Sequence, residues 1–184
     1  VPAAFSQVRI IQTNSGGDNI HLIDPATNKI VGEVKGVPIN HGAAASPDGS
    51  RLYFSSEAER TLDVVDGKTL QITKKIPLSG RPNNIFASPD GKRVYVGIVS
   101  EPGAVDVIDT TTLEKVKTIP TKGGIHNVYV TPDGKYIVAG SIAGRHLEVL
   151  DTTTHELLWT AFNEGVRPIT FEKNPDGSTN RMFV

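Results

Sequence analysis

The chain has 184 residues, a formal net charge of -1 and no cysteine. The near-zero charge provides no bulk field that would attract nucleic acid or anionic lipid. The lack of cysteine excludes disulfides, thiolate nucleophiles and cysteine-ligated metal centres. With 18 Gly, 12 Pro and only 6% aromatic residues, the composition is typical of many short strands joined by tight turns. No apolar run reaches the ~18 residues that a membrane helix needs.

Two sequence markers recur along the chain with one period. The first is Ser46-Pro47-Asp48-Gly49, which returns in related form at 88–91, 131–134 and 174–177, at spacings of 42, 43 and 43 residues. The second is an Asp followed three residues later by a Thr, and it runs out of phase with the first. It begins at Asp24, Asp66, Asp109 and Asp151. Two independent markers that keep one period predict a tandem structural repeat.

The predicted elements in chain order are strands. Residues 9–13 match the second strand of a repeat, because Arg9, Arg51 and Arg93 are spaced 42 residues apart; strands at 20–24 and 29–34 follow. The next repeats each contain a short apolar segment, the Pro-Asp-Gly turn, a β-branched or aromatic run, an alternating strand that ends in Asp, and a fourth strand. In one repeat these strands are 84–87, 93–96, 105–109 and 115–119. Four short strands per ~43 residues predict an all-β fold, a β-propeller of four-stranded antiparallel blades.

The repeat divides residues 1–184, a single propeller region, into five predicted blades. They cover approximately 1–36 without a first strand, 37–78, 79–121, 122–163, and 164–184 with only the first two strands. The last strand then lacks partners within its own blade. We therefore expect either a continuation of the chain as part of a longer ring, or two copies that associate through open blade edges.

The repeated aspartates are predicted to close turns. An Asp side chain can accept hydrogen bonds from backbone amides two or three residues further on, and a Thr hydroxyl can assist. Because these carboxylates recur with the turns in every repeat, turn closure explains all of them without a catalytic or calcium role. The sequence also contains no Gly-x-Ser-x-Gly, no Walker loop, no dinucleotide fingerprint and no His-Glu-x-x-His.

The segment 107–120, followed by His126-Asn127 and by Thr131-Pro-Asp-Gly-Lys-Tyr-Ile-Val138, resembles the YVTN family of propeller repeats. The resemblance extends over essentially the whole chain. The sequence departs from the family pattern at the segment 93–97, because the family often has an Asn two residues after this segment. The resemblance implies a ring of about seven blades and an extracytoplasmic location, periplasmic or secreted.

The candidate site lies where the first strands of the blades begin, because these strands line the central channel of a propeller. Six positions before each Pro-Asp-Gly proline stand His41, Asn83 and His126, and eight positions before it stand Arg81 and Arg167. Imidazoles can bind a metal, and a guanidinium can grip a carboxylate or phosphate. We expect these five residues either to fill the channel mouth and fix its loops or to bind a ligand, with His41 and His126 as the ligands of any metal.

The remaining polar residues are expected to be at the surface. His21 occupies a third-strand position that is Asp63, Asp106 or Glu148 in the other blades, and this position is predicted to face solvent. His146 and His155 are predicted to be exposed in turns. Charged side chains of the loops between second and third strands could form a rim that recognises a partner. They are Glu57, Glu59, Arg60, Glu101 and Arg145.

The sequence favours a non-catalytic binding scaffold that recognises an unknown protein or small-molecule ligand through its loop rims and channel mouth. No cofactor is predicted, nucleic acid is not an expected partner, and catalytic residues are not assigned. The alternative is a propeller enzyme, either a lactonase-like hydrolase or a metal- or cofactor-dependent oxidoreductase, with its site at the channel mouth.

Overall fold

The computed structural model describes residues 8–162, 166 and 168–184. Every helix or strand found in this part of the chain is a β-strand. No helix in the described residues is long and apolar enough to cross a membrane. The strands form antiparallel sheets whose order follows the chain, so the predicted all-β propeller architecture is confirmed.

The strands group into five sheets, which we call blades 1 to 5. Blade 1 has β1 (Ile10–Thr13), β2 (Asn19–Asp24) and β3 (Lys29–Lys35). Blade 2 has β4 (Asn40–Ala45), β5 (Arg51–Ser56), β6 (Thr61–Asp66) and β7 (Ile72–Pro77). Blade 3 has β8 (Pro82–Ala87), β9 (Arg93–Ile98), β10 (Ala104–Asp109) and β11 (Glu114–Pro120). Blade 4 has β12 (Asn127–Val130), β13 (Tyr136–Ser141), β14 (His146–Asp151) and β15 (Leu157–Phe162). Blade 5 pairs β16 (Thr170–Lys173) with β17 (Thr179–Phe183).

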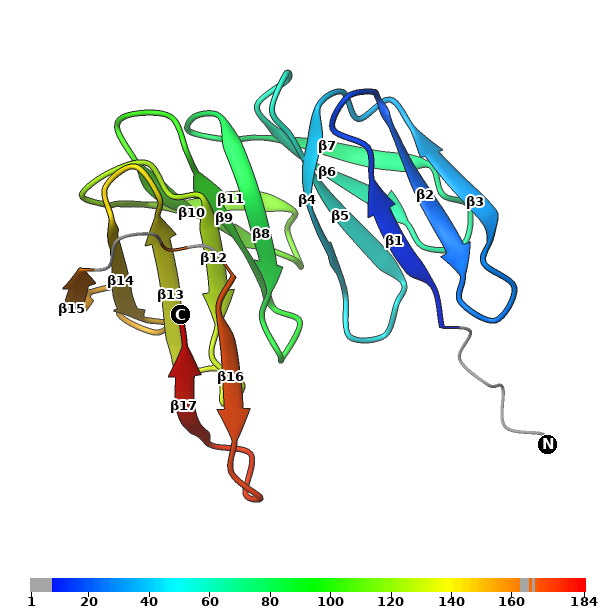
Figure 1. The fold of residues 1–184 in the computed structure, drawn as a ribbon. Helices are drawn as coiled ribbons and strands as arrows, with labels where there is room; N and C mark the ends of the chain where they lie inside the picture. The colour runs from blue at the N-terminus through cyan, green and yellow to red at the C-terminus, as the bar shows by residue number, and fades with distance from the viewer. Residues whose placement is uncertain (1–7, 163–165, 167) are drawn as a thin grey trace.

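The blades stand side by side in an arc, with the first strands on the inside. β4, β8 and β12 lie close together, whereas the fourth strands β7 and β11 barely touch (Figure 1). Gly42 permits the close approach of β4 to β8, because a Cβ built there would lie 2.7 Å from the backbone oxygen of Asn83. Tight inner strands and splayed outer strands produce the radial arrangement of a propeller.

The core lies between neighbouring blades. One cluster joins Tyr53 and Val64 of blade 2 to Val94 and Val96 of blade 3, and the next cluster joins Tyr95 on the opposite face of blade 3 to residues of blade 4. The middle strands of blades 2 to 4 are therefore buried on both faces, as β-branched runs such as Arg93–Ile98 require.

The turns have the hydrogen bonds that the sequence predicts. In the Pro-Asp-Gly turn of blade 2, the Ser46 hydroxyl donates to Asp48 over 2.6 Å and Gly49 has a φ of 70°. In the turn between β6 and β7, the backbone N–H of Thr69 donates to the Asp66 carboxylate over 2.8 Å. The same two patterns recur in blades 3 and 4. The repeated aspartates therefore serve turn closure.

The prediction that the third-strand polar position faces solvent is wrong in blades 2 to 4. Asp63, Asp106 and Glu148 are at most 1% exposed, and His21 of blade 1 is half-buried. The side chains of Asp106 and Glu148 project from the third strand into the interface with the preceding blade, where they reach the connecting loop, whereas Asp63 makes no such hydrogen bond among the described residues. Asp106 accepts the backbone N–H of Ser79 at 2.7 Å, and Glu148 accepts that of Lys122 at 2.9 Å.

The prediction that His146 is exposed is also wrong. His146 is 4% exposed because it is the first residue of β14 rather than part of a free loop, and its Nε2 lies 3.3 Å from the buried Glu148 carboxylate. His155 is half-buried in the turn before β15, and burial lowers the pKa of its imidazole.

Candidate functional site

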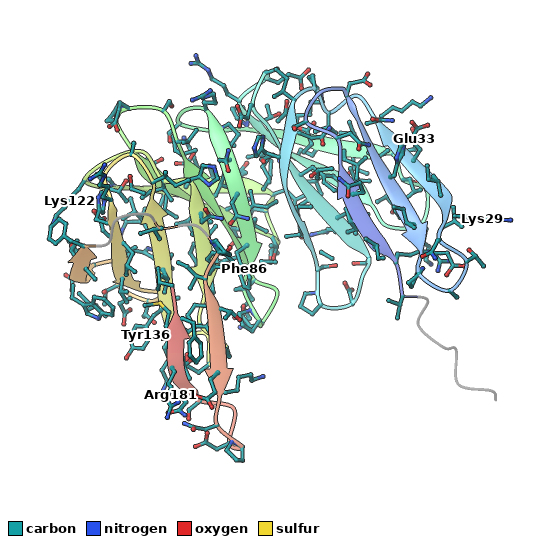
Figure 2. The ribbon with its side chains drawn as sticks, in the orientation of Figure 1. Lys29, Glu33, Phe86, Lys122, Tyr136 and Arg181 are labelled. Carbon is teal, nitrogen blue, oxygen red and sulfur yellow. The ribbon has the colours of Figure 1, made fainter. Side chains whose placement is uncertain are left out.

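The candidate site lies at one end of the blades. In antiparallel sheets, the starts of the first strands share an end with the loops that join second to third strands. The Pro-Asp-Gly turns lie at the opposite end, which is the lower edge in Figure 1 for β4–β5, β8–β9 and β16–β17. Figure 2 shows the same separation in blades 4 and 5, where Lys122 lies at the upper end and Arg181 at the lower one.

At this end, three of the five predicted site residues meet around one carboxylate, that of Glu57. Its Oε1 lies 3.1 Å from His41 Nδ1 and accepts a hydrogen bond from the Asn83 side-chain amide at 3.1 Å. Its Oε2 lies 3.6 Å from Arg81 Nη1. We call these four residues the Glu57 cluster. It joins β4 and the β5–β6 loop of blade 2 to the start of blade 3.

The Glu57 cluster is an accessible group of donors around a shielded acceptor. The His41 and Arg81 side chains are 39% and 53% exposed, whereas that of Glu57 is 13% exposed. A carboxylate that accepts one amide hydrogen bond and lies against two basic side chains holds their orientation, while part of the imidazole and of the guanidinium faces solvent. The cluster can therefore offer N–H donors to an oxygen-rich ligand.

The backbone beneath the cluster is fixed by bonds between blades. The Ser55 hydroxyl accepts the N–H of Gly42 at 2.7 Å and donates to the carbonyl of Asn83 at 2.6 Å. Since Ser55 is fully buried, the hydroxyl ties β4 and β8 together without competition from water. The Glu57 cluster thus rests on a rigid support.

His126 does not join the cluster. Its Nδ1 pairs with the side-chain oxygen of Asn127 at 2.8 Å, and its backbone carbonyl accepts the N–H of Asn84 at 3.2 Å. In the described part of the chain, no hydrogen bond or ion pair connects its ring to His41, Arg81 or Asn83. Arg167, the fifth predicted residue, lies outside the described residues.

Of the predicted rim residues, two carboxylates hold neighbouring segments in place, two arginines are exposed, and one residue belongs to the Glu57 cluster. Glu101 accepts the backbone N–H of Gly124 at 2.9 Å and thereby holds the loop before β12. Glu59 pairs with Lys75 of β7. Arg60 and Arg145 are exposed, with positive φ angles of 56° and 51° in their loops. Only Glu57 of this set enters the cluster, and sequence analysis missed its central position.

A metal centre at this end is not evident in the described residues, which contain no group of three or more His, Cys, Asp or Glu side chains able to hold an ion. His41 nevertheless has one feature of a ligating imidazole, because the carboxylate at Nδ1 leaves Nε2 free.

The chain is similar to one protein family and, among other proteins, to a leptospiral antigen and to a solved hydrazine synthase structure. The family model described as Cytochrome D1 heme domain matches residues 8–128. Antigen Lp49 from Leptospira interrogans serogroup Icterohaemorrhagiae serovar copenhageni (strain Fiocruz L1-130) is 30% identical over 93 residues, which are 50% of this chain and 20% of that protein. The solved structure titled Kuenenia stuttgartiensis Hydrazine Synthase aligns with a TM-score of 0.82 and 27% identity, over 96% of this chain and 56% of that one. The chain thus spans a fifth of one relative and little more than half of the other.

Proposed function

Since the chain belongs to the Cytochrome D1 heme domain family, we propose that it is part of an extracytoplasmic β-propeller that binds a carboxylate-bearing ligand, without catalysis, at the Glu57 cluster. The proposal also holds that its repeats are of the YVTN type, which is supported by the Pro-Asp-Gly and Asp-x-x-Thr turns in successive blades.

The observation that carries this proposal is the convergence of His41, Arg81 and Asn83 on Glu57. This constellation is specific to the junction of blades 2 and 3, unlike the turn aspartates that recur in each blade. Its four side chains include no Ser, Thr or Cys nucleophile, and Glu57 is engaged by all three of its neighbours, which supports binding over covalent catalysis. The exposed guanidinium of Arg81 suits a carboxylate, because its N–H groups match the two oxygens.

The family name implies haem, so the fit of these residues to haem requires a test. A haem macrocycle needs broad apolar walls and an axial ligand. His41 could supply the ligand, but the groups held against it are a carboxylate, a guanidinium and an amide. The surroundings of His41 therefore do not fit a haem, and the proposal assigns no step to one.

The alternative function is that of a metal- or cofactor-dependent oxidoreductase or a lactonase-like hydrolase. The observation in its favour is the His41 Nδ1–Glu57 contact of 3.1 Å, which orients the imidazole as in metal sites. This alternative requires the free Nε2 of His41 to bind a metal.

The experiment compares binding of citrate, metal-free protoporphyrin IX and hemin by calorimetry and absorbance titration. Carboxylate recognition without a haem site predicts that citrate binds more tightly than either porphyrin, and that Arg81→Gln weakens citrate binding by roughly tenfold or more, since it removes a charged hydrogen-bonding partner. Arg145→Gln is the control, because Arg145 is an exposed arginine of the β13–β14 loop, at the same end of the blades but outside the Glu57 cluster. This variant should bind citrate as tightly as the unmodified chain.

Two outcomes oppose the proposal. Failure of citrate to bind refutes a carboxylate site at the Glu57 cluster. Binding of hemin alone, with loss of its altered absorbance in His41→Ala, favours the metal-dependent alternative instead.

A further inference from the structure

Two similar grooves lie at the opposite end of the blades, between the Pro-Asp-Gly turns of neighbours. The groove between blades 2 and 3 has a volume of about 430 Å³, and its lining includes Arg51, Tyr53 and Asp90. The groove between blades 3 and 4 has a volume of about 410 Å³, and its lining includes Arg93, Tyr95 and Asp133. We call them the turn grooves. Each combines an Arg and a Tyr of one blade with an Asp of the next.

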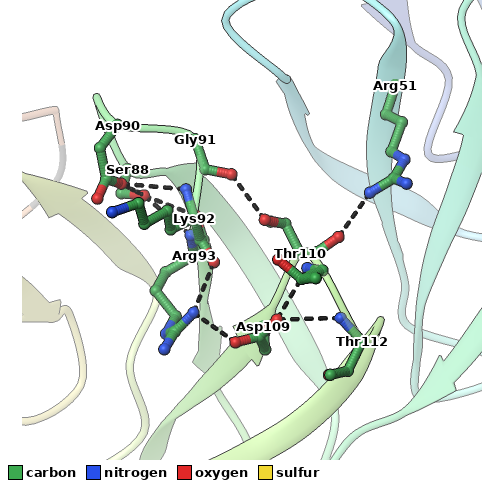
Figure 3. Close-up of polar contacts among 10 residues, drawn as sticks. Arg51, Ser88, Asp90, Gly91, Lys92, Arg93, Asp109, Thr110 and Thr112 are labelled. Atoms are coloured by element: carbon green, nitrogen blue, oxygen red, sulfur yellow. Dashed lines mark hydrogen bonds and ion pairs between the residues drawn. The ribbon is translucent and has the colours of Figure 1, made fainter.

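The guanidinium groups in the turn grooves are held in place. Arg51 Nη1 donates to the carbonyl oxygen of Thr110 in the next blade at 2.5 Å, as Figure 3 shows. Arg93 Nη1 donates to the Asp109 carboxylate at 2.6 Å. Each guanidinium has five N–H donors, so these contacts leave others available to a ligand.

The two tyrosines supply the second observation. Tyr53 and Tyr95 are 1% and 2% exposed, yet both line a groove. Among the described residues, neither phenol hydroxyl has a hydrogen-bond partner. Neither hydroxyl oxygen is among the fully buried side-chain atoms that lack a partner, so both reach the solvent of the groove, where a ligand can replace water as their partner. Burial raises the pKa of Tyr95, so its hydroxyl keeps its proton at neutral pH and can donate.

The two turn grooves are consecutive, because Asp90 lines both of them. Hydrogen bonds from Ser88 and from the backbone N–H of Lys92 lower the pKa of Asp90, so it remains an acceptor at neutral pH (Figure 3). Each groove therefore presents both a cationic donor and an anionic acceptor. This mixture disfavours a polyanion or a polycation and matches the hydroxyl groups of a sugar chain.

We propose that the two turn grooves bind successive units of a neutral oligosaccharide. This site lies at the other end of the blades from the Glu57 cluster and does not depend on it. The groove between blades 4 and 5 does not share the set, since Tyr136 and Val138 stand at the positions of the Arg and the Tyr, and Trp159 and Met182 make it apolar.

The test measures binding of chitotetraose, cellotetraose and maltotetraose to the full chain by calorimetry. At least one tetrasaccharide should bind at millimolar concentration or below. Tyr53→Phe and Tyr95→Phe each remove only a hydroxyl, and each should weaken that binding roughly three- to tenfold. The double variant should lose roughly the product of the two effects if the grooves act independently.

Tyr129→Phe is the control, because it removes a half-buried hydroxyl that accepts from Asn127 outside the turn grooves. It should bind like the unmodified chain, and thermal unfolding of all variants should coincide. The proposal is overturned if no tetrasaccharide binds, or if the double variant binds as tightly as the control. Binding of polyglutamate or polylysine, weakened by the same two substitutions, would overturn the sugar assignment in favour of a charged polymer.

Discussion

Asp106 offers a direct measure of what holds neighbouring blades together. Its fully buried carboxylate accepts the Ser79 backbone N–H at 2.7 Å and the Thr118 hydroxyl at 2.6 Å. In Asp106→Asn, the side-chain oxygen can keep one donor, while the new NH₂ group faces the other. Losing one charge-assisted hydrogen bond and opposing a buried donor should lower the free energy of unfolding by about 2–3 kcal/mol.

Asp63 is the matched comparison, because it occupies the same position in blade 2. Its Oδ1 accepts the Thr61 hydroxyl at 2.6 Å, but its Oδ2 is buried without a hydrogen bond, and its nearest cation is Lys75 at 3.5 Å. Burial raises the pKa of Asp63, so the charged form costs stability at neutral pH. Asp63→Asn removes that charge and should change the free energy of unfolding by less than about 1 kcal/mol.

The assay is urea unfolding of both variants at pH 7, followed by far-ultraviolet circular dichroism and by the fluorescence of Trp159. The expected order of stability is Asp63→Asn close to the unmodified chain, with Asp106→Asn well below both. An Asp63→Asn variant that loses as much stability as Asp106→Asn would refute the reasoning, because the loop hydrogen bond at Ser79 would then not be the source of the stability.

Three further predictions concern the turns, the channel and the open face. Hydrogen bonds from Ser46 and Ser50 lower the pKa of Asp48 from 3.8 to about 2. The contribution of this carboxylate to stability is therefore complete above its pKa in the unfolded chain, and it is lost as the pH falls from that value through about 2. The urea midpoint should drop over that range, and less steeply in Asp48→Asn. Gly42→Ala should lower the free energy of unfolding by about 1–3 kcal/mol, because its Cβ would lie 2.7 Å from the β8 backbone. A Cβ at Gly16 would have nothing within 4 Å, so Gly16→Ala should leave the free energy of unfolding unchanged in the same assay. The open face is that of β15, the outer strand of blade 4, where Trp159 is 48% exposed at the position that Lys117 and Lys74 occupy in blades 3 and 2. Because an exposed Trp favours association of two copies, light scattering should show a mass above 19.7 kDa that rises with concentration and falls in Trp159→Lys. A constant mass in both proteins would exclude self-association through this face.

The repeat and its turns could be derived from the sequence because they are local. A Pro-Asp-Gly turn needs a fixed φ at Pro, a positive φ at Gly and a carboxylate beside the next amides, and all three lie within four or five residues. The same holds for Asp66 and the N–H of Thr69. Local chemistry that recurs with one period identifies strands, turns and hence the all-β class.

The environment of the polar side chains was decided by tertiary structure. Asp106 and the half-buried His21 stand in equivalent alternating strands, but only the neighbouring blade determines that Asp106 reaches the Ser79 amide. Glu57 was recognised as a charged loop residue, yet its contact with Arg81 depends on how closely blades 2 and 3 approach. The turn grooves likewise arise only where two blades meet. Sequence periodicity specifies what each blade is, whereas packing between blades specifies which polar groups are buried, paired or left open to a ligand.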